Sequence, residues 1–204
     1  MYSTIKDQCL QLTQKFDEIP DERKEILSQL STHIKEQRQK NQAINLVYIC
    51  THNSRRSHLG QVWGAVAANY YGISGINTYS GGTEATAFNP NAIKALKTAG
   101  FEITELAQGQ NPRYLVSFGE DLSTTCFSKI YDDKENPSDN FVAIMTCSHA
   151  EENCPYIPGV DLRIGITYDD PKAFDGTPQQ DEKYLERSNQ LALESLYVFS
   201  QIKA

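Results

Sequence analysis

The stretch Asn45-Leu-Val-Tyr-Ile-Cys-Thr-His-Asn-Ser-Arg-Arg-Ser57 decides how the rest of the chain is interpreted. Its first five residues form a short apolar, β-branched run, which is typical of a buried strand. The Ala-rich stretch 59–71 is predicted to be a helix that ends at Gly72. The residues between them therefore form a loop from the carboxyl end of a strand to the start of a helix. This loop contains a Cys-x5-Arg motif, Cys50 to Arg56.

The alternation of strands and helices continues along the chain. Further strands are expected at 76–80, 141–146 and 161–167, and further helices at 90–99 and 181–203. Alternating elements of this kind indicate βαβ units, whose strands run parallel in one sheet. We therefore predict an α/β fold with a mainly parallel four-stranded sheet flanked by helices.

Two segments lie outside this alternation. Residues 1–43 are predicted to be helical, since Pro20 and the acids after it suit a first helical turn. We expect them to form an extension packed on a main domain at 44–204. The segment at about 108–140 contains Asn-Pro pairs and an acidic cluster and is predicted to be an insertion, with one helix at 113–118.

Composition and charge exclude several classes of protein. The 204 residues carry 19 Lys and Arg against 26 Asp and Glu, so no broad basic face for nucleic acid is expected. The longest apolar runs, 46–50 and 141–145, are far shorter than the roughly 20 residues of a membrane-spanning helix. No apolar leader opens the chain, and the five cysteines form no Cys-x2-Cys pair. We expect a cytoplasmic protein without metal or cofactor, whose cysteines are thiols.

The loop at 50–57 has the chemistry of an oxyanion site. Backbone N–H groups converge where a strand ends and a helix begins, and the helix dipole favours an anion there. These donors and Arg56 would stabilise Cys50 as a thiolate, and a guanidinium can hold two oxygens of a tetrahedral oxyanion. The simpler alternative is a buried cysteine beside a surface arginine. We predict that Cys50 is the nucleophile, that Arg56 is the oxyanion clamp, and that the other substrate-binding residues are Thr51, His52, Asn53, Ser54, Arg55 and Ser57.

A second pair of thiols follows the strand predicted at 141–146. Six residues separate Cys147 from Cys154. A structural disulfide is unusual in a reducing compartment, and a metal site would need further ligands at suitable spacing. His149 lies between the two cysteines and is expected to be a solvated loop residue.

The motif Asp169-Asp-Pro171 follows the last predicted strand. A carboxylic acid on a rigid loop facing the nucleophile can protonate a leaving oxygen. The alternative is a helix cap or turn, because Asp-Pro is common in loops. The motif alone leaves both interpretations open for Asp170.

Together these motifs resemble a known family, the low-molecular-weight protein tyrosine phosphatases and the thioredoxin-coupled arsenate reductases that share their fold. The loop at 50–57 looks like the phosphate-binding loop of both branches. Tyr79-Ser-Gly-Gly82 and Asn89-Pro-Asn-Ala-Ile93 are similar to the second strand and the next helix start of the reductases. The resemblance covers most of 44–107 and 140–200.

The resemblance implies a role for each motif. Cys147 and Cys154 would form the redox pair of an arsenate reductase, and Asp170 would be the general acid of both branches. In such a reductase Cys50 attacks arsenate, Cys147 attacks Cys50 and releases arsenite, Cys154 attacks Cys147, and thioredoxin reduces the final disulfide. The alternative is a phosphatase that hydrolyses phosphotyrosine or small phosphoesters through a phosphocysteine, and a third possibility is a non-catalytic binding module. Lys172-Ala173 favours the reductase, because the phosphatases usually have aromatic residues there.

The sequence also departs from the family pattern. His52 stands where many family loops have glycine, and Arg55 stands where many have a third cysteine. Gln61 replaces a glutamate that helps to hold potassium in some reductases, so no metal is expected. Cys9 and Cys126 match no family position and are expected to be ordinary thiols.

Overall fold

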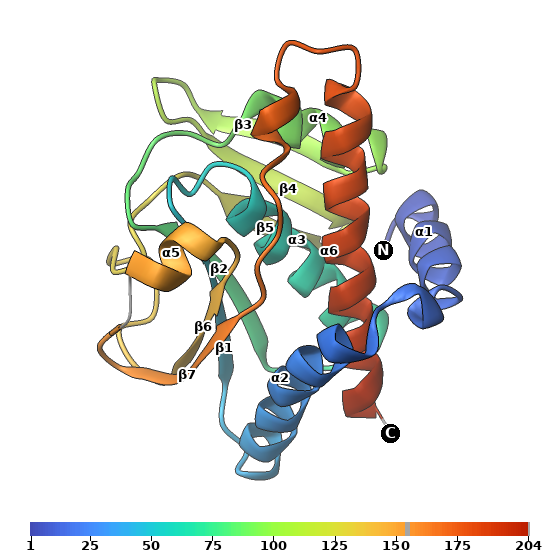
Figure 1. Cartoon of the computed structure of the whole chain (residues 1–204), viewed down its shortest axis with the longest axis vertical. Coiled ribbons are helices and arrows are strands. Elements are labelled where there is room, and N and C mark those ends of the chain that lie inside the picture. Colours follow the sequence, from blue (N-terminus) through green and yellow to red (C-terminus); the bar gives the residue numbers. More distant parts are fainter. Residues whose placement is uncertain (154–155, 204) are drawn as a thin grey trace.

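The computed structural model describes residues 1–153 and 156–203, and its centre is a parallel sheet (Figure 1). The strands are β1 (Ile44–Cys50), β2 (Ile76–Gly82), β6 (Phe141–Met145) and β7 (Val160–Gly165). They run parallel in the order β2-β1-β6-β7. The predicted four-stranded parallel sheet is confirmed.

The described part of residues 44–204 also forms three longer helices, of which the first packs directly on this sheet. They are α3 (Arg56–Tyr70), α4 (Pro90–Thr98) and α6 (Gln180–Lys203). Helix α3 contacts β1, β2 and α6, and α4 packs on the other end of α6. The opposite face of the sheet, with Val47 and Ile49, is covered by the short helix α5 (Ser148–Asn153) and the residues around it. The loop expected around His149 is wrong, because this residue lies on α5.

Close packing of α3 on β1 depends on two glycines. A Cβ atom at Gly60 or at Gly64 would lie 2.4 Å from an atom of the Tyr48 ring. A buried hydrogen bond holds the other side of the helix, since Nε1 of Trp63 donates to Oγ of Ser188 on α6 at 2.9 Å. These contacts fix the amino end of α3 next to the end of β1, where the loop at 50–57 begins.

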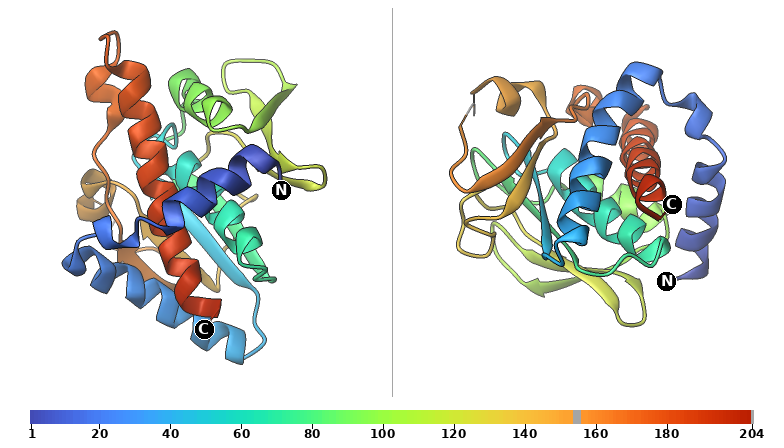
Figure 2. Two further views of the ribbon diagram at one scale, coloured as in Figure 1. Left: turned by 90° about the vertical axis from the view of Figure 1, so that its right-hand side faces the viewer. Right: turned by 90° about the horizontal axis from the view of Figure 1, so that it is seen from below.

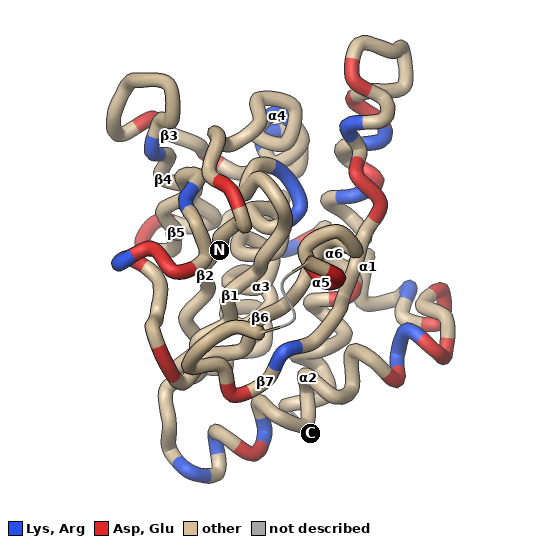
Figure 3. The backbone as a smooth tube through the Cα atoms, turned by 60° about the vertical axis from the view of Figure 1, so that its left-hand side comes forward, with Lys and Arg blue, Asp and Glu red and all other residues tan. Residues whose placement is uncertain are grey.

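The amino-terminal extension consists of α1 (Ser3–Thr13), a 3₁₀ turn (Phe16–Glu18) and α2 (Asp21–Gln39). The two helices lie on either side of α6 (Figure 2). Their apolar side chains join the main core, where Ile5 and Ile34 are fully buried. Acidic and basic residues are interspersed along α2 and α6 (Figure 3).

The inserted segment differs from the prediction. The helix expected at 113–118 is wrong, because β4 (Arg113–Gly119) pairs antiparallel with β3 (Glu102–Ala107) and β5 (Leu122–Cys126) in a second, three-stranded sheet. Along β4, Val116 and Phe118 are buried while Ser117 between them is half-buried, which is the two-residue period of a strand. None of the helices in the described part of the chain has the length and hydropathy of a transmembrane segment.

Candidate active site

The carboxyl ends of the parallel strands bring three distant motifs to one edge of the sheet. The loop at 50–57 follows β1, Cys147 follows β6, and Asp170 follows β7 by a few residues. This edge is where α/β folds place their ligands. The sequence motifs that were separated by about a hundred residues therefore meet in space.

Cys50 is buried, and its sulfur contacts a hydroxyl group of the same loop. Sγ lies 3.1 Å from Oγ of Ser57, the second residue of α3. Nδ2 of Asn53 donates to that Oγ at 2.8 Å, so the hydroxyl proton of Ser57 is free to be donated to the sulfur. A hydrogen bond of this kind stabilises a thiolate, as a nucleophilic cysteine requires.

The one left-handed residue of the loop is Asn53, whose φ is 42°. Asparagine tolerates this conformation better than other non-glycine residues. Its Oδ1 accepts a hydrogen bond from the backbone N–H of Lys129 at 2.8 Å, which ties the loop to the inserted segment. His52, at the family's glycine position, does not have a positive φ; its half-exposed ring lies 3.6 Å from Glu84.

Arg56 is held by the segment that carries the acidic motif. Its Nη1 donates to the carbonyl oxygen of Tyr168 at 2.8 Å, and its Nη2 lies 2.6 Å from Oδ2 of Asp170. Nε of Arg56 is buried without a partner among the residues that the structure describes. A buried donor without a partner is unfavourable, so this N–H is suited to an oxyanion.

Only one of the two adjacent acids faces the loop. The Asp170 carboxylate contacts Arg56 and also accepts a hydrogen bond from the backbone N–H of Lys172 at 3.0 Å. The side chain of Asp169 is 98% exposed and lies 3.6 Å from Arg187. The carboxylate that caps the turn at Lys172 also contacts Arg56 of the loop. The helix-cap interpretation of Asp170 is therefore compatible with the general-acid interpretation.

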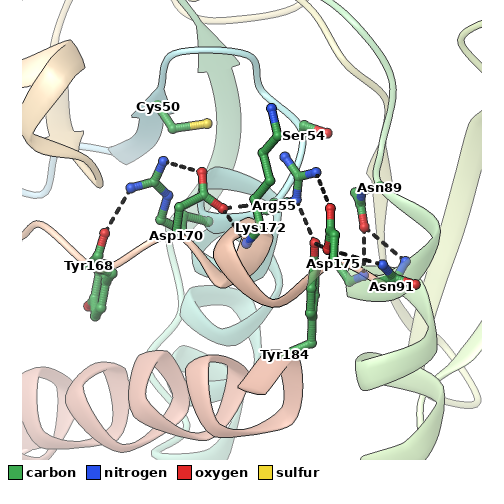
Figure 4. A network of polar contacts seen from close by, with 12 residues as sticks. Cys50, Ser54, Arg55, Asn89, Asn91, Tyr168, Asp170, Lys172, Asp175 and Tyr184 are labelled. Atoms are coloured by element: carbon green, nitrogen blue, oxygen red, sulfur yellow. Dashed lines mark hydrogen bonds and ion pairs between the residues drawn. The ribbon is translucent and has the colours of Figure 1, made fainter. Parts of the chain in front are cut away.

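Arg55 is fixed by a second network (Figure 4). Its Nε donates to the Tyr184 hydroxyl at 2.7 Å, and this hydroxyl donates to Asp175 at 2.7 Å. The other end of the guanidinium lies 3.3 Å from Asp175, and Nε lies 3.9 Å from Asp170. Burial and the bond to Asp175 raise the pKa of Tyr184, so the phenol keeps its proton. Arg55 was predicted from its place in the loop, whereas Tyr184 and Asp175 were not among the predicted site residues.

Two further side chains lie beside the loop. Figure 4 shows the Lys172 side chain extending from the acidic motif toward Cys50 and Ser54. Oγ of Ser54 donates to the carbonyl of Ala87 at 2.8 Å, so its hydroxyl secures the loop. Lys172 therefore adds a cation where an aromatic residue would have added an apolar wall.

Cys147 lies against the loop that carries Cys50. It is 1% exposed, and its Sγ lies 3.5 Å from Oγ1 of Thr51 and accepts a hydrogen bond from the backbone N–H of Ala150 at 3.4 Å. His149 is exposed as expected, and its Nδ1 lies 3.2 Å from the same Thr51 hydroxyl. The second redox candidate, Cys154, lies outside the described residues.

The remaining departures have structural explanations. Nε2 of Gln61 donates to Thr124 and to the backbone of Thr125 at 2.7 and 2.9 Å. Within the described ranges, no group of three or more His, Cys, Asp or Glu residues is suited to a metal ion. Cys9 and Cys126 are fully buried, and burial raises the pKa of each thiol to about 12.

The parallel sheet and the loop together define a protein of the low-molecular-weight protein tyrosine phosphatase fold. A solved arsenate reductase in a phosphate-binding state has a TM-score of 0.52 and 16% identity, and the match covers 78% of this chain and 98% of that one. A low-molecular-weight protein tyrosine phosphatase from T. tengcongensis has a TM-score of 0.51 and 16% identity, with 78% and 97% covered. These likenesses establish the fold.

Sequence relatives identify the branch. The chain is 30% identical to an arsenate reductase of Bacillus licheniformis over 142 residues, which are 70% of this chain and 84% of the relative. It is 32% identical to an arsenate reductase of Bacillus cereus over 126 residues, 62% of this chain and 75% of the relative. The protein therefore belongs to the arsenate reductase family of this fold and is an enzyme of that family. No protein-family model matches the sequence.

Proposed function

We propose that the protein reduces arsenate to arsenite and draws the two electrons from a thioredoxin. The position of Cys147 is the observation that carries this proposal. A buried thiol 3.5 Å from the side chain of Thr51, the residue after Cys50, supports a role for Cys147 as the second nucleophile. In a phosphatase, water hydrolyses the phosphocysteine and regenerates the thiol, so no second thiol is needed. A reductase must supply two electrons to its substrate, and the oxidation of two thiols to a disulfide supplies them.

The first half of the reaction uses the oxyanion loop. The Cys50 thiolate attacks arsenic while Nε of Arg56 and the loop N–H groups hold the oxygens. Asp170 protonates the departing hydroxide, so a sulfur–arsenic bond forms, an arsenic–oxygen bond breaks and water leaves. The contact between Arg56 and Asp170 supports this assignment, since it keeps the acid next to the clamp.

The second half transfers electrons through thiols. The Cys147 thiolate attacks the sulfur of Cys50, so a disulfide forms and the sulfur–arsenic bond breaks. Its electron pair stays with arsenic, which leaves as arsenite. Cys154 then attacks Cys147 and releases Cys50 as a thiolate, and the dithiol of thioredoxin reduces the resulting disulfide.

The side chains after Pro171 suit a small dianion better than an aryl phosphoester, because Lys172 and Ala173 stand where the tyrosine phosphatases usually have aromatic residues. Asp170 and Asp175 contact the guanidinium groups of Arg55 and Arg56, and Lys172 adds a further positive charge. Figure 4 shows the Lys172 side chain directed toward Cys50 and Ser54. Cations near a site raise the local concentration of an anionic substrate. The family's sequence relatives named arsenate reductase support the same choice.

The test is steady-state NADPH consumption with thioredoxin and thioredoxin reductase, with and without arsenate. We expect turnover that depends on arsenate, that is abolished by Cys147→Ser and that is preserved in Cys9→Ala, whose thiol is buried between helices far from the loop. The same rate with and without arsenate would refute the proposal. Hydrolysis of an aryl phosphate that depends on Cys50 would then assign the protein to the phosphatase branch.

A further inference from the structure

One hydroxyl group lies between a thiol and an imidazole at the edge of the active site. Oγ1 of Thr51 is 3.5 Å from Sγ of Cys147 and 3.2 Å from Nδ1 of His149. Both partners belong to the segment after β6, whereas Thr51 belongs to the loop after β1. The three side chains therefore form a continuous line of hydrogen-bonding atoms between two separate segments.

This arrangement permits two patterns of protons. A hydroxyl group has one proton to donate and two lone pairs to accept with. In the first pattern the Cys147 thiol donates to Thr51, and the Thr51 hydroxyl donates to the neutral imidazole. In the second pattern the imidazolium of His149 donates to Thr51, and Thr51 donates to the Cys147 thiolate. The two patterns are the beginning and the end of one proton transfer.

We propose that His149 accepts the proton of the Cys147 thiol through the Thr51 hydroxyl when Cys147 attacks Cys50. The inference rests on the proposed function, because it concerns the second half of that reaction. The thiol proton passes to Thr51 oxygen, and the Thr51 proton passes to Nδ1 of His149. The sulfur lone pair forms the bond to Cys50, and the pair of the sulfur–arsenic bond departs with arsenite.

The surroundings of the two end groups support this role. Cys147 is 1% exposed, so bulk water has little access to its proton, whereas His149 is exposed and can return the proton to solvent. The N–H of Ala150 donates to the sulfur, which favours the thiolate. Nδ2 of Asn153 donates to the carbonyl of His149 at 2.8 Å and holds the backbone that carries the imidazole.

The experiment isolates one step. In a Cys154→Ser background the reaction stops at the disulfide between Cys50 and Cys147. Reduced protein is mixed with arsenate and quenched with acid, and the disulfide is counted by mass spectrometry against time. We expect His149→Ala and His149→Asn to slow its formation about a hundredfold, within the usual range for loss of a proton acceptor. Protection of Cys50 from alkylation by phosphate should be unchanged, which shows that the loop is folded.

Rescue distinguishes proton transfer from support of the structure. Added imidazole should restore the rate of His149→Ala in proportion to its concentration. His149→Asn should respond less, because its amide fills the same space and can bond Thr51 without taking a proton. In Thr51→Val, where the link is missing, the additional change His149→Ala should cost no further rate.

Each other outcome has a separate meaning. A His149→Ala variant that forms the disulfide at the parent rate would overturn this inference and leave the proposed function standing. A slow variant that ignores imidazole would show that His149 only holds the segment in place, which also overturns it. If the parent itself forms no disulfide with arsenate, the proposed function fails, and this inference fails with it.

Discussion

The carboxylate of Asp170 lies 2.6 Å from Nη2 of Arg56, so the proposed acid and the proposed oxyanion clamp contact each other directly. Nη1 of Arg56 is bonded to the Tyr168 carbonyl, whereas Nε is buried with no partner in the part of the chain that the structure describes. An oxyanion can accept a hydrogen bond from Nε while Nη1 stays bonded to Tyr168 and Nη2 stays bonded to Asp170. The guanidinium can therefore hold the oxyanion and the acid at the same time.

Removing the acid should separate catalysis from binding. Asp170→Asn keeps an oxygen that can accept from Arg56 and from the Lys172 N–H, but it has no proton to give to a leaving oxygen. We expect kcat for arsenate to fall by about 10²–10⁴, with inhibition by phosphate retained. Steady-state kinetics measures both. Asp169→Asn is the matched control, since that side chain is 98% exposed and should leave kcat unchanged. Equal losses in the two variants would contradict the assignment.

Tyr184 is expected to act on substrate binding through Arg55. Tyr184→Phe removes the hydroxyl that accepts from Nε of Arg55 and donates to Asp175. The guanidinium then loses one of its anchors, and we expect KM for arsenate to rise about three- to tenfold, the effect of one hydrogen bond. The free energy of unfolding should also fall by about 1–3 kcal/mol, because the buried Nε loses its acceptor. A change in kcat with KM unchanged would show that Tyr184 acts on the chemical step.

Packing of α3 on the sheet gives a prediction about stability. A Cβ at Gly60 would lie 2.4 Å from the Tyr48 ring, and either the ring or the helix would have to move. Gly60→Ala should lower the free energy of unfolding by about 1–3 kcal/mol, as overpacking of a core does. Urea denaturation followed by Trp63 fluorescence measures this change.

Gly72→Ala is not a suitable control, because Gly72 has a φ of 66° that strains any other residue. Ala65→Ser, on a half-buried part of the same helix, is a better control.

The part of the fold that follows from local patterns could be predicted. The apolar run at 45–49 and the helix that ends before Gly72 determine β1, the loop and α3 without help from distant residues. The strand β4 could not be predicted in this way. Its residues Tyr-Leu-Val-Ser-Phe fit one turn of a buried helix as well as a strand, and only pairing with β3 and β5 selects the strand.

The same limit applies to the site. Cys50 and Arg56 belong to one short loop, so their spacing alone places them together. Tyr184 lies 129 positions from Arg55 on a long amphipathic helix, where an aromatic residue is expected to belong to the core. Nothing near it in sequence indicates that its hydroxyl reaches an arginine. The contact becomes visible only when α6 is packed beside α3.

Stability should depend on pH through one buried histidine. Burial, and then the charge of Lys129, lower the pKa of His58 well below its usual value. The unfolded chain therefore binds a proton at His58 below about pH 6.5, and the folded protein does not. The contribution of His58 to stability is complete above that pH and is lost as the pH falls, by about 1.4 kcal/mol per pH unit at most.

A matched variant isolates this group from the other histidines. His58→Asn can keep a hydrogen bond to Ser80, which lies 3.1 Å from Nδ1 of His58, but it does not titrate. The difference in free energy of unfolding between wild type and variant should shrink as the pH falls from 7 to 5. A difference that stays constant over this range would show that His58 is protonated in the folded protein.

Native alkylation should separate the thiols by environment. The thiolate is the species that reacts, and burial raises the pKa of Cys9 and of Cys126 to about 12, so both remain thiols at pH 8. Neither sulfur is exposed to the reagent. Cys50 differs, because the Ser57 hydroxyl lies 3.1 Å from its sulfur and can donate a hydrogen bond to a thiolate. We expect iodoacetamide to label Cys50 rapidly and phosphate to protect it, while Cys9 and Cys126 react only in urea, as peptide mass spectrometry would show. Labelling of Cys126 in the folded protein would contradict its burial at the end of β5. A native Cys50 that resists the reagent would remove the nucleophile on which the mechanism depends.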